Sequence, residues 1–137
     1  MASQNSEIEQ TSLGEGLWLS GKVVRGLQNG RRFGFPTINI ALDESCSVED
    51  TGVFAVELIL RERPYKGMLY IGTRPTLSLQ DKTLEINIFD FDGECYDEDV
   101  KFRIGPKIRS EQKFVSVEDL INQLKKDKDE IRQIFDN

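Results

Sequence analysis

The 137-residue chain contains no histidine. This absence excludes histidine-based catalytic triads, histidine general bases and most zinc sites, because each depends on an imidazole ring. Proton transfer would therefore fall to Asp, Glu, Lys, Tyr or Cys. Cysteine is scarce too, since Cys46 and Cys95 are the two present and lie far apart. The N-terminus lacks the apolar core of a secretory signal, so we expect both thiols to be free and the protein to be cytoplasmic.

Other features are also missing. No apolar run approaches the ~20 residues of a membrane span. Basic residues are in the minority, with 18 Lys and Arg against 24 Asp and Glu and a net charge of −6. General nucleic-acid binding requires a basic face, so this balance argues against it. Neither the Walker phosphate-binding motif nor the dinucleotide fingerprint occurs. We expect no nucleic-acid or membrane partner, and we expect a monomer.

The rest of the composition is ordinary for a globular protein, with 38% hydrophobic and 31% charged residues. A chain of this length can form one hydrophobic core. Residues 1–15 are polar and rich in Ser, Gln and Glu, so we expect a disordered leader. We assign residues 16–137 to a single barrel domain.

Apolar, β-branched and alternating segments predict six strands separated by turns. The predicted strands span residues 17–25, 35–41, 52–60, 65–72, 83–89 and 100–108, the last with a bend at Gly105-Pro106. The pattern then becomes helical: Ser116 is a good N-cap, and apolar residues recur at helical spacing from Leu120 to Phe135. Short strands and one terminal helix indicate an antiparallel sheet closed into a barrel, with the helix covering one opening.

The loop between the first two strands is rich in glycine and arginine. Gly26, Gly30 and Gly34 permit positive φ angles and a close approach to a ligand, and backbone N–H groups in such a turn form an anion-binding concavity. Arg31 and Arg32 add charge that suits phosphate oxygens. The alternative is a hairpin loop whose glycines only turn the chain and whose arginines are solvated.

Two oxygen-bearing side chains follow this loop. Thr37 and Asn39 are spaced i, i+2, so an extended segment puts both on one face, opposite Ile38 and Ile40. Neutral oxygens beside bound phosphates suit Mg²⁺, which keeps several waters and takes further ligands from the phosphates. Thr37 and Asn39 are therefore candidate ligands for a metal and a nucleotide.

Acidic side chains are the remaining candidates for proton transfer. Glu85 lies mid-strand between apolar neighbours, where alternation alone favours an exposed residue on the solvent face. Glu57, inside an apolar strand, is a rival candidate base with the same alternative interpretation. Asp90 and Asp92 lie in a turn, where we expect solvated side chains.

Together these motifs resemble the riboflavin kinase (flavokinase) family, and they occur in the family's order over about residues 17–135. The Gly-x-Pro-Thr-x-Asn and Gly-x-x-Pro-Thr motifs in series, followed by Leu-Glu, are a specific signal, whereas any one alone is weak. The segments that carry the resemblance are Gly21-Lys22-Val23-Val24-Arg25-Gly26, Gly30-Arg31, Gly34-Phe35-Pro36-Thr37-Ile38-Asn39, Gly52-Val53-Phe54, Ile71-Gly72-Thr73-Arg74-Pro75-Thr76, Leu84-Glu85, Phe89-Asp90-Phe91-Asp92-Gly93 and Arg109-Ser110-Glu111-Gln112-Lys113-Phe114.

The resemblance implies a mainly β fold, a six-stranded antiparallel Greek-key β-barrel with one C-terminal α-helix. It implies the reaction ATP + riboflavin → FMN + ADP with Mg²⁺, so riboflavin/FMN and ATP/ADP are the expected partners. By resemblance, Glu85 is the catalytic base for the ribityl 5′-hydroxyl, and Thr37 and Asn39 hold the metal and the nucleotide. The other implied residues are Gly26, Gly30, Arg31, Arg32 and Gly34 for the ATP phosphates, and Phe102, Arg109 and Phe114 for the flavin.

The sequence departs from the family's pattern at two places near the site. Ile38 replaces the alanine of Pro-Thr-Ala-Asn, and its side chain should face away from the ligands. After Tyr96 the family usually has glycine, whereas Asp97-Glu98-Asp99 follows here, a change that bears on the path of the loop and on the adenine or flavin contacts expected there. The nucleotidyltransferase domain of many bacterial members has no counterpart in these residues, so we expect FMN to be the final product.

Two alternatives stay open. One is a barrel that binds flavin or nucleotide without catalysis, motivated by the altered loop and by the frequency with which folds outlive their activities. The other is a structural or interaction barrel with solvated motifs. The kinase interpretation requires Glu85 to lie close to Thr37 and Asn39, at a shared mouth of the barrel.

Overall fold

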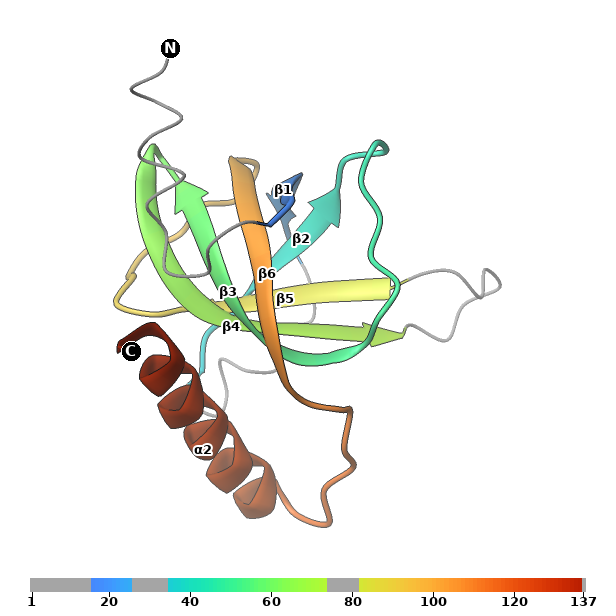
Figure 1. Ribbon diagram of the computed structural model, residues 1–137, viewed down its shortest axis with the longest axis vertical. Coiled ribbons are helices and arrows are strands. Elements are labelled where there is room, and N and C mark those ends of the chain that lie inside the picture. Colours follow the sequence, from blue (N-terminus) through green and yellow to red (C-terminus); the bar gives the residue numbers. More distant parts are fainter. Residues whose placement is uncertain (1–15, 26–34, 74–81, 137) are drawn as a thin grey trace.

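Strands dominate the part of the chain that the computed structural model describes, which comprises residues 16–25, 35–73 and 82–136 (Figure 1). The elements are β1 (Trp18–Val24), β2 (Ile38–Leu42), β3 (Gly52–Leu60), β4 (Arg63–Thr73), β5 (Lys82–Ile88), β6 (Asp99–Arg109) and α2 (Val117–Asp136). Every predicted strand and the predicted helix are present. Within the described residues no helix is long and apolar enough to cross a membrane. The expected leader, residues 1–15, lies outside the described part.

The strands close into a barrel in the order β1-β2-β5-β4-β3-β6, and each neighbouring pair is antiparallel. The β2–β3 and β5–β6 connections each join strands that are not neighbours, which is Greek-key connectivity. Closure gives every strand two partners and so protects the edges of the sheet. The predicted six-stranded antiparallel Greek-key barrel with a C-terminal helix is confirmed.

Alternation along the strands creates two hydrophobic cores, one inside the barrel and one outside it. Val56 and Leu69 belong to the inner core, whereas Ala55 and Met68, their neighbours in sequence, face outward. The second core lies between this outer face of β3 and β4 and the buried stripe of α2, which includes Ile131. The helix therefore packs on the outer wall of the barrel, beside β3 and β4 (Figure 1). The expectation that it covers an opening was wrong, because its apolar stripe meets these outward-facing residues.

Local features follow the sequence closely. Ser116 Oγ accepts a hydrogen bond from the Asp119 N–H at 3.1 Å, so Ser116 is the N-cap of α2. The pairing of β6 with β3 shifts register around Gly105-Pro106, where a bend was predicted. The β3–β4 turn is tighter than the predicted residues 61–64: Arg61 and Glu62 form it, with φ angles of 54° and 64°.

Candidate functional site

A row of polar side chains crosses the outer face of the barrel on β2, β5 and β4. Glu85 on β5 pairs directly with Asn39 on β2 and with Tyr70 on β4. Residues paired in this way project to the same face of the sheet. Leu84 and Ile86, which flank Glu85, are buried in the inner core, so the row faces outward. Glu85 thus lies beside Asn39 on the outer wall, which corrects the expected position at the mouth of the barrel.

Two buried oxygens next to this row are not fully hydrogen-bonded. Asn87 Oδ1 makes no hydrogen bond within the described residues, and Thr37 Oγ1 makes none of full geometry, although its hydroxyl lies close enough to Glu85 to act on that carboxyl group. Asn87 shares the face of Glu85 by alternation, and its Nδ2 donates to the Pro36 carbonyl at 2.7 Å, which fixes the backbone just before Thr37. Buried polar atoms usually have partners, and leaving one without is costly. The two oxygens therefore fit a polar ligand or a hydrated cation such as Mg²⁺.

The environment of Glu85 favours its protonated form more than water does. The side chain is half-buried, and this burial raises the pKa of its carboxyl group, while the neighbouring Thr37 hydroxyl lowers it in part. A raised pKa gives the carboxylate a higher proton affinity than an ordinary glutamate. That property suits a general base that takes a proton from a hydroxyl group.

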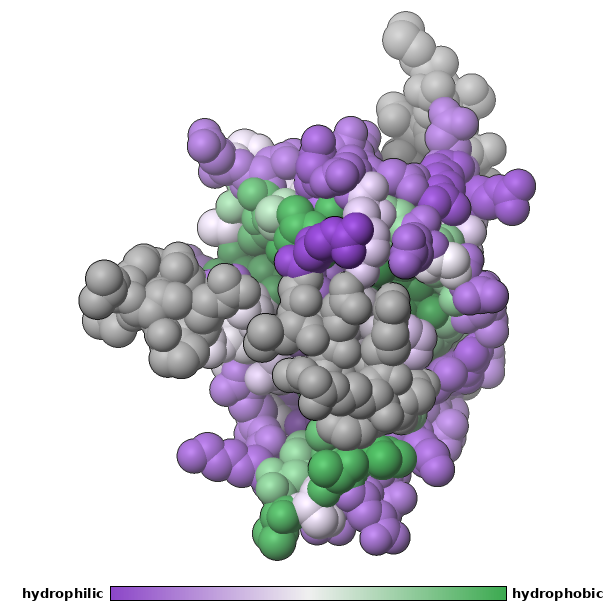
Figure 2. Space-filling view, turned by 180° about the vertical axis from the view of Figure 1, so that it is seen from behind, coloured by the Kyte–Doolittle hydropathy of each residue, from purple (hydrophilic) through white to green (hydrophobic). Residues whose placement is uncertain are grey.

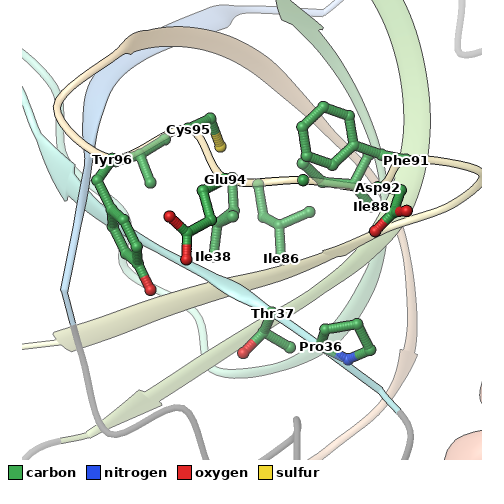
Figure 3. A pocket seen from close by; sticks show the side chains of 12 residues that line it. Pro36, Thr37, Ile38, Ile86, Ile88, Phe91, Asp92, Glu94, Cys95 and Tyr96 are labelled. Atoms are coloured by element: carbon green, nitrogen blue, oxygen red, sulfur yellow. The ribbon is translucent and has the colours of Figure 1, made fainter.

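A pocket of about 320 Å³ opens at the end of the barrel beside Thr37 (Figure 3). The loop between β5 and β6 crosses over it, and Glu94 and Tyr96 project from this loop toward the side where Thr37 lies. The Arg25 guanidinium lies 4.3 Å from the centre of the Tyr96 ring. Inward-facing isoleucines from β2 and β5 form the apolar wall, namely Ile38, Ile86 and Ile88. Apolar walls with a few convergent polar groups are typical of small-molecule sites.

Arg61 ties the loop over this pocket to the β3–β4 hairpin. Its Nε and Nη2 donate to the two carboxylate oxygens of Glu98 at 2.8 and 2.6 Å, and Nη2 also donates to the Glu94 carbonyl at 2.6 Å. These bonds lower the pKa of Glu98 and raise the pKa of Arg61. A bidentate guanidinium–carboxylate contact fixes geometry as well as distance. The hairpin therefore anchors the loop.

The same loop is also anchored to β1. The Asp97 N–H donates to the Val23 carbonyl at 2.8 Å, and the buried Cys95 belongs to the inner core. Asp97 adopts a φ of 66°, a conformation that glycine adopts with less strain. This is the position after Tyr96 at which the family's pattern has glycine. Aspartate tolerates this region better than most residues, so Asp97 is compatible with the turn that the loop makes here.

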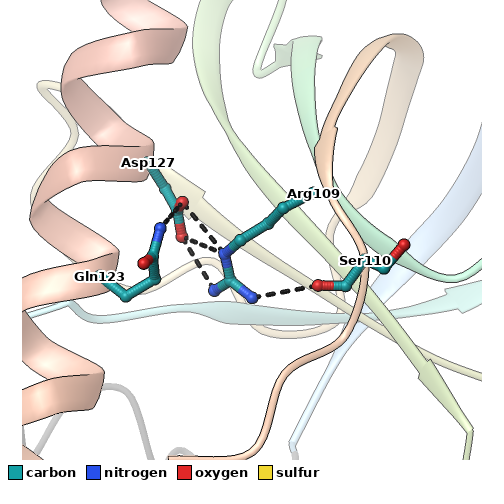
Figure 4. Close-up of polar contacts among 4 residues, drawn as sticks. All are labelled: Arg109, Ser110, Gln123 and Asp127. Atoms are coloured by element: carbon teal, nitrogen blue, oxygen red, sulfur yellow. Dashed lines mark hydrogen bonds and ion pairs between the residues drawn. The ribbon is translucent and has the colours of Figure 1, made fainter.

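Arg109, at the end of β6, is held by the helix (Figure 4). Its Nη2 lies 2.9 Å from Asp127 Oδ2, and its Nε donates to both carboxylate oxygens at 3.1 and 3.0 Å. Gln123 Nε2 donates to Asp127 Oδ1 at 2.9 Å. The Asp127 side chain is 1% exposed, so this ion pair is largely shielded from water. The Arg109 guanidinium also lies 5.6 Å from the centre of the Phe114 ring, which brings the two expected flavin residues together.

Tyr70 connects this segment to the polar row. Its hydroxyl donates to Glu111 Oε1 at 3.3 Å, and Glu111 lies between Arg109 and Phe114 in sequence. This bond links the outer face of β4 to the segment that leads to α2.

Other candidate residues lie elsewhere. Phe102 is fully buried in the inner core, where contact with a bound flavin would require the barrel to open. Glu57, the rival base, is buried and pairs with Arg103 at 3.3 Å. Asp90 and Asp92 are exposed, as expected. The expected phosphate-binding residues Gly26, Gly30, Arg31, Arg32 and Gly34 lie outside the described residues, and their role stays a prediction.

Sequence reasoning did not single out Tyr70, Asn87 or Asp127. Asn87 carried a signal, because it alternates with apolar residues in step with Glu85. Asp127 carried one too, since it interrupts an apolar helical stripe four residues before Ile131. Tyr70 carried none, because its place opposite Glu85 depends on the register of β4 and β5.

The family model and the curated relatives point to the same family. A family model described as riboflavin kinase matches residues 13–135. A bifunctional riboflavin kinase/FMN adenylyltransferase of Bacillus subtilis is 37% identical over 141 residues, which cover 99% of this chain and 45% of that protein. The chain thus spans about half the length of the curated relatives that it matches first.

Two solved structures share the fold. The riboflavin kinase from Trypanosoma brucei matches with a TM-score of 0.63 and 28% identity, covering 88% of this chain and 80% of that chain. A crystal structure described as a macrolide-efflux protein from Streptococcus pneumoniae matches with a TM-score of 0.80 and 34% identity. It covers 85% of this chain and 38% of that one.

Proposed function

This chain belongs to the riboflavin kinase family, and we propose that it transfers the γ-phosphoryl group of ATP to the ribityl 5′-hydroxyl of riboflavin, giving FMN and ADP. The observation that carries the proposal is the placement of Glu85 beside Asn39 on one face of the β2–β5 ladder, with the Thr37 hydroxyl next to it. The ribityl oxygen forms the new bond to phosphorus, and the bond from the γ-phosphorus to the β–γ bridging oxygen breaks. Such transfer depends mainly on positioning and charge neutralisation.

Glu85 is the general base in this proposal. The ribityl hydroxyl proton passes to its carboxylate as the new bond forms, and the proton later leaves to solvent. Burial raises the pKa of Glu85, which strengthens its carboxylate as a proton acceptor.

Thr37 and Asn39 are the proposed residues for the metal and the nucleotide. The buried Thr37 hydroxyl, which makes no hydrogen bond of full geometry within the described residues, supports this role, because a hydrated Mg²⁺ or a phosphate would complete its bonding. Bound there, the ion would neutralise charge on the phosphate oxygens. No acidic cluster is required of the protein when the phosphates themselves supply ligands.

The pocket beneath the β5–β6 loop is the proposed site of the nucleotide base. It has an apolar wall of isoleucines, and Thr37 lies at its edge, so a base in the pocket would direct its phosphates toward Thr37 and Glu85. The expected phosphate loop, residues 26–34, begins next to Arg25, which stacks on Tyr96 at this pocket.

The flavin lies on the opposite side of Glu85 in this proposal. Arg109 and Phe114 lie together there, and Val115 and Val117 are exposed by 99% and 53%. Figure 2 shows hydrophobic surface at the lower end of the molecule, where the segment before α2 lies. The isoalloxazine ring is flat and apolar, so it would cover surface of this kind.

The direct test mixes the protein with riboflavin, ATP and Mg²⁺ and measures FMN by chromatography. We expect FMN from the wild-type protein and a loss of about 10²- to 10⁴-fold for Glu85→Gln, the usual contribution of a general base. Burial raises the pKa of Glu85, so the folded protein holds this proton more tightly than the unfolded chain does. The free energy of unfolding therefore falls as pH rises from the ordinary glutamate pKa through the raised one. Glu85→Gln should therefore unfold at the same temperature as the wild type, or higher, at pH 7.

The matched control is Glu44→Gln, in an exposed turn, which should leave FMN formation unchanged. The acid limb of the wild-type pH–rate profile should have its midpoint above the ordinary pKa of glutamate. The profile measured from the residual activity of Glu85→Gln should lack this limb. Turnover of riboflavin by Glu85→Gln at the wild-type rate would refute the assignment of the base.

We also infer that the protein acts in the cytoplasm as a monomer that binds no nucleic acid. Cys46 and Cys95 are both free thiols, which supports a reducing compartment. The net charge of −6 weighs against nucleic-acid binding.

A further inference from the structure

We propose that Tyr70 recognises the flavin: its ring is the rigid wall on which the isoalloxazine of riboflavin stacks, next to Glu85. The inference rests on the proposed function, because it names the contact by which that site would select its flat acceptor substrate.

Register places Tyr70 at the site. It is the direct cross-strand partner of Glu85, on the outer face of the barrel. Opposed residues of an antiparallel pair have Cβ atoms about 5 Å apart. A ligand whose hydroxyl reaches the Glu85 carboxylate therefore passes within contact distance of the Tyr70 ring.

The ring is exposed and yet held in place. Tyr70 is 36% exposed, whereas aromatic residues of the two cores, such as Phe102, are nearly or fully buried. A Cβ atom added at Gly72 would lie 2.8 Å from both Cε2 and the hydroxyl oxygen of Tyr70. The ring therefore lies along β4, directly over Gly72, in space that any side chain at position 72 would occupy.

The hydroxyl end of the ring is fixed as well. It donates to Glu111 at 3.3 Å, in the segment that carries Arg109 and Phe114. Burial raises the pKa of Tyr70, and the nearby charges of Glu111 and Glu85 raise it further. The phenol thus stays neutral and bonded at physiological pH, so its role is contact rather than proton transfer.

These features match one ligand chemistry. A flat aromatic ring system gains from stacking on a preorganised aromatic side chain, because little side-chain entropy is lost on binding. Glu85, on one side of Tyr70, is positioned for a hydroxyl group. Arg109 and Phe114, on the other side, offer a cation and a second apolar surface. A ribityl isoalloxazine carries both parts, a polyol and a flat ring, in this order.

The test is a titration of riboflavin with the protein, followed through the quenching of flavin fluorescence that stacking on a tyrosine causes. Tyr70→Leu removes the ring and should weaken riboflavin binding by about three- to tenfold, the size expected for one aromatic contact. It should also lose most of the quenching at saturation. Tyr70→Phe keeps the ring and should bind within about twofold of the wild type.

Two controls separate recognition from general damage. Tyr65→Leu is the same substitution on the same strand, at a ring that packs against Phe91, and should leave riboflavin binding unchanged. The KM for ATP should be the same for Tyr70→Leu and for the wild type. Gly72→Ala, which displaces the ring, should weaken riboflavin binding when it is the only substitution. Added to Tyr70→Leu, it should weaken binding no further.

Unchanged binding and quenching in Tyr70→Leu would overturn the proposal. Equal losses in Tyr70→Phe and Tyr70→Leu would also overturn it, because the hydroxyl bond rather than the ring would then be responsible. The titration needs neither ATP nor turnover. A wild-type protein that binds riboflavin through Tyr70 but makes no FMN would therefore contradict the kinase proposal alone.

Discussion

Two aspartates bound the loop that covers the pocket, and both adopt left-handed backbone conformations. Asp90 has a φ of 60° and Asp97 a φ of 66°. Aspartate tolerates this region better than most residues, because its short side chain can bond to nearby backbone, but glycine enters it without a steric penalty. Of the two, only Asp97 stands where the family's pattern has glycine, so at that position we expect the aspartate to lower the stability of the protein slightly.

We predict that Asp97→Gly stabilises the protein by about 0.5 kcal/mol, with a rise in Tm of about 2 °C. The gain is small because glycine also increases the entropy of the unfolded chain. Thermal unfolding of the two proteins measures it. The control is Asp99→Gly, at the first residue of β6, which should destabilise slightly, because glycine loses more conformational freedom on folding than aspartate and gains no relief of strain there. A lower Tm for Asp97→Gly would contradict the account of strain.

The β5–β6 loop depends on a partner from another part of the chain. Arg61 reaches it from the β3–β4 hairpin with bonds to both the side chain of Glu98 and the backbone of Glu94. Surface ion pairs contribute little to stability, so the effect of this contact should appear in the loop's position rather than in the Tm.

Arg61→Ala should therefore raise the KM for ATP severalfold and leave both the Tm and the KM for riboflavin close to wild type. Arg61→Lys should restore only part of the affinity, because an ammonium group cannot form the bidentate contact. Steady-state kinetics with each substrate varied in turn provide the measurement. Arg63→Ala, at the exposed start of β4, is the control. An unchanged KM for ATP in Arg61→Ala would show that the loop needs no anchor.

Elements were predictable from the sequence, whereas contacts between distant elements were not. The alternation of Leu84, Glu85, Ile86 and Asn87 indicates which side chains share a face. It does not indicate which strands pair with β5. The pairing of Tyr70 with Glu85 follows from the register of β4 and β5 in the closed barrel. A closed barrel has an outer wall as well as a mouth, and the sequence pattern does not distinguish a site on one from a site on the other.

The pocket was unpredictable for a similar reason. Its roof is a loop whose path is set by Arg61, Cys95 and the Val23 carbonyl, which are scattered along the chain. The same limit applies to Asp127, because its partner Arg109 is separated from it by a turn and half a helix.

At the scale of the whole molecule, the two proposed ligand sites lie on different surfaces of one wall. The pocket for the nucleotide faces the inside of the barrel at its end, where Ile38 and Ile86 line it. Tyr70 and Arg109 lie on the outside. Thr37 and Glu85 lie between the two, so both ligands can approach their meeting point without crossing.

We therefore predict that ADP·Mg²⁺ and FMN bind together and that neither displaces the other. Each should stabilise the fold by about 2.7 kcal/mol at a hundredfold excess over its Kd, and the increases in Tm should be close to additive. Thermal unfolding with each ligand and with both measures this. Competition, seen as a combined Tm no higher than the larger single value, would mean that the two sites overlap.

The pairing of β2 with β5 places isoleucines on one surface and oxygens on the other. A register shift of one residue between these strands would move each side chain of the shifted strand to the opposite face of the sheet. Thr37 and Asn39 would then face the hydrophobic core, and Ile38 would face water. Such a chain would lose both its hydrophobic core and its functional site. Natural selection for a barrel that merely folds would thus preserve the alignment of the reactive groups as well, and a correctly refolded sample should regain turnover in step with its tertiary structure.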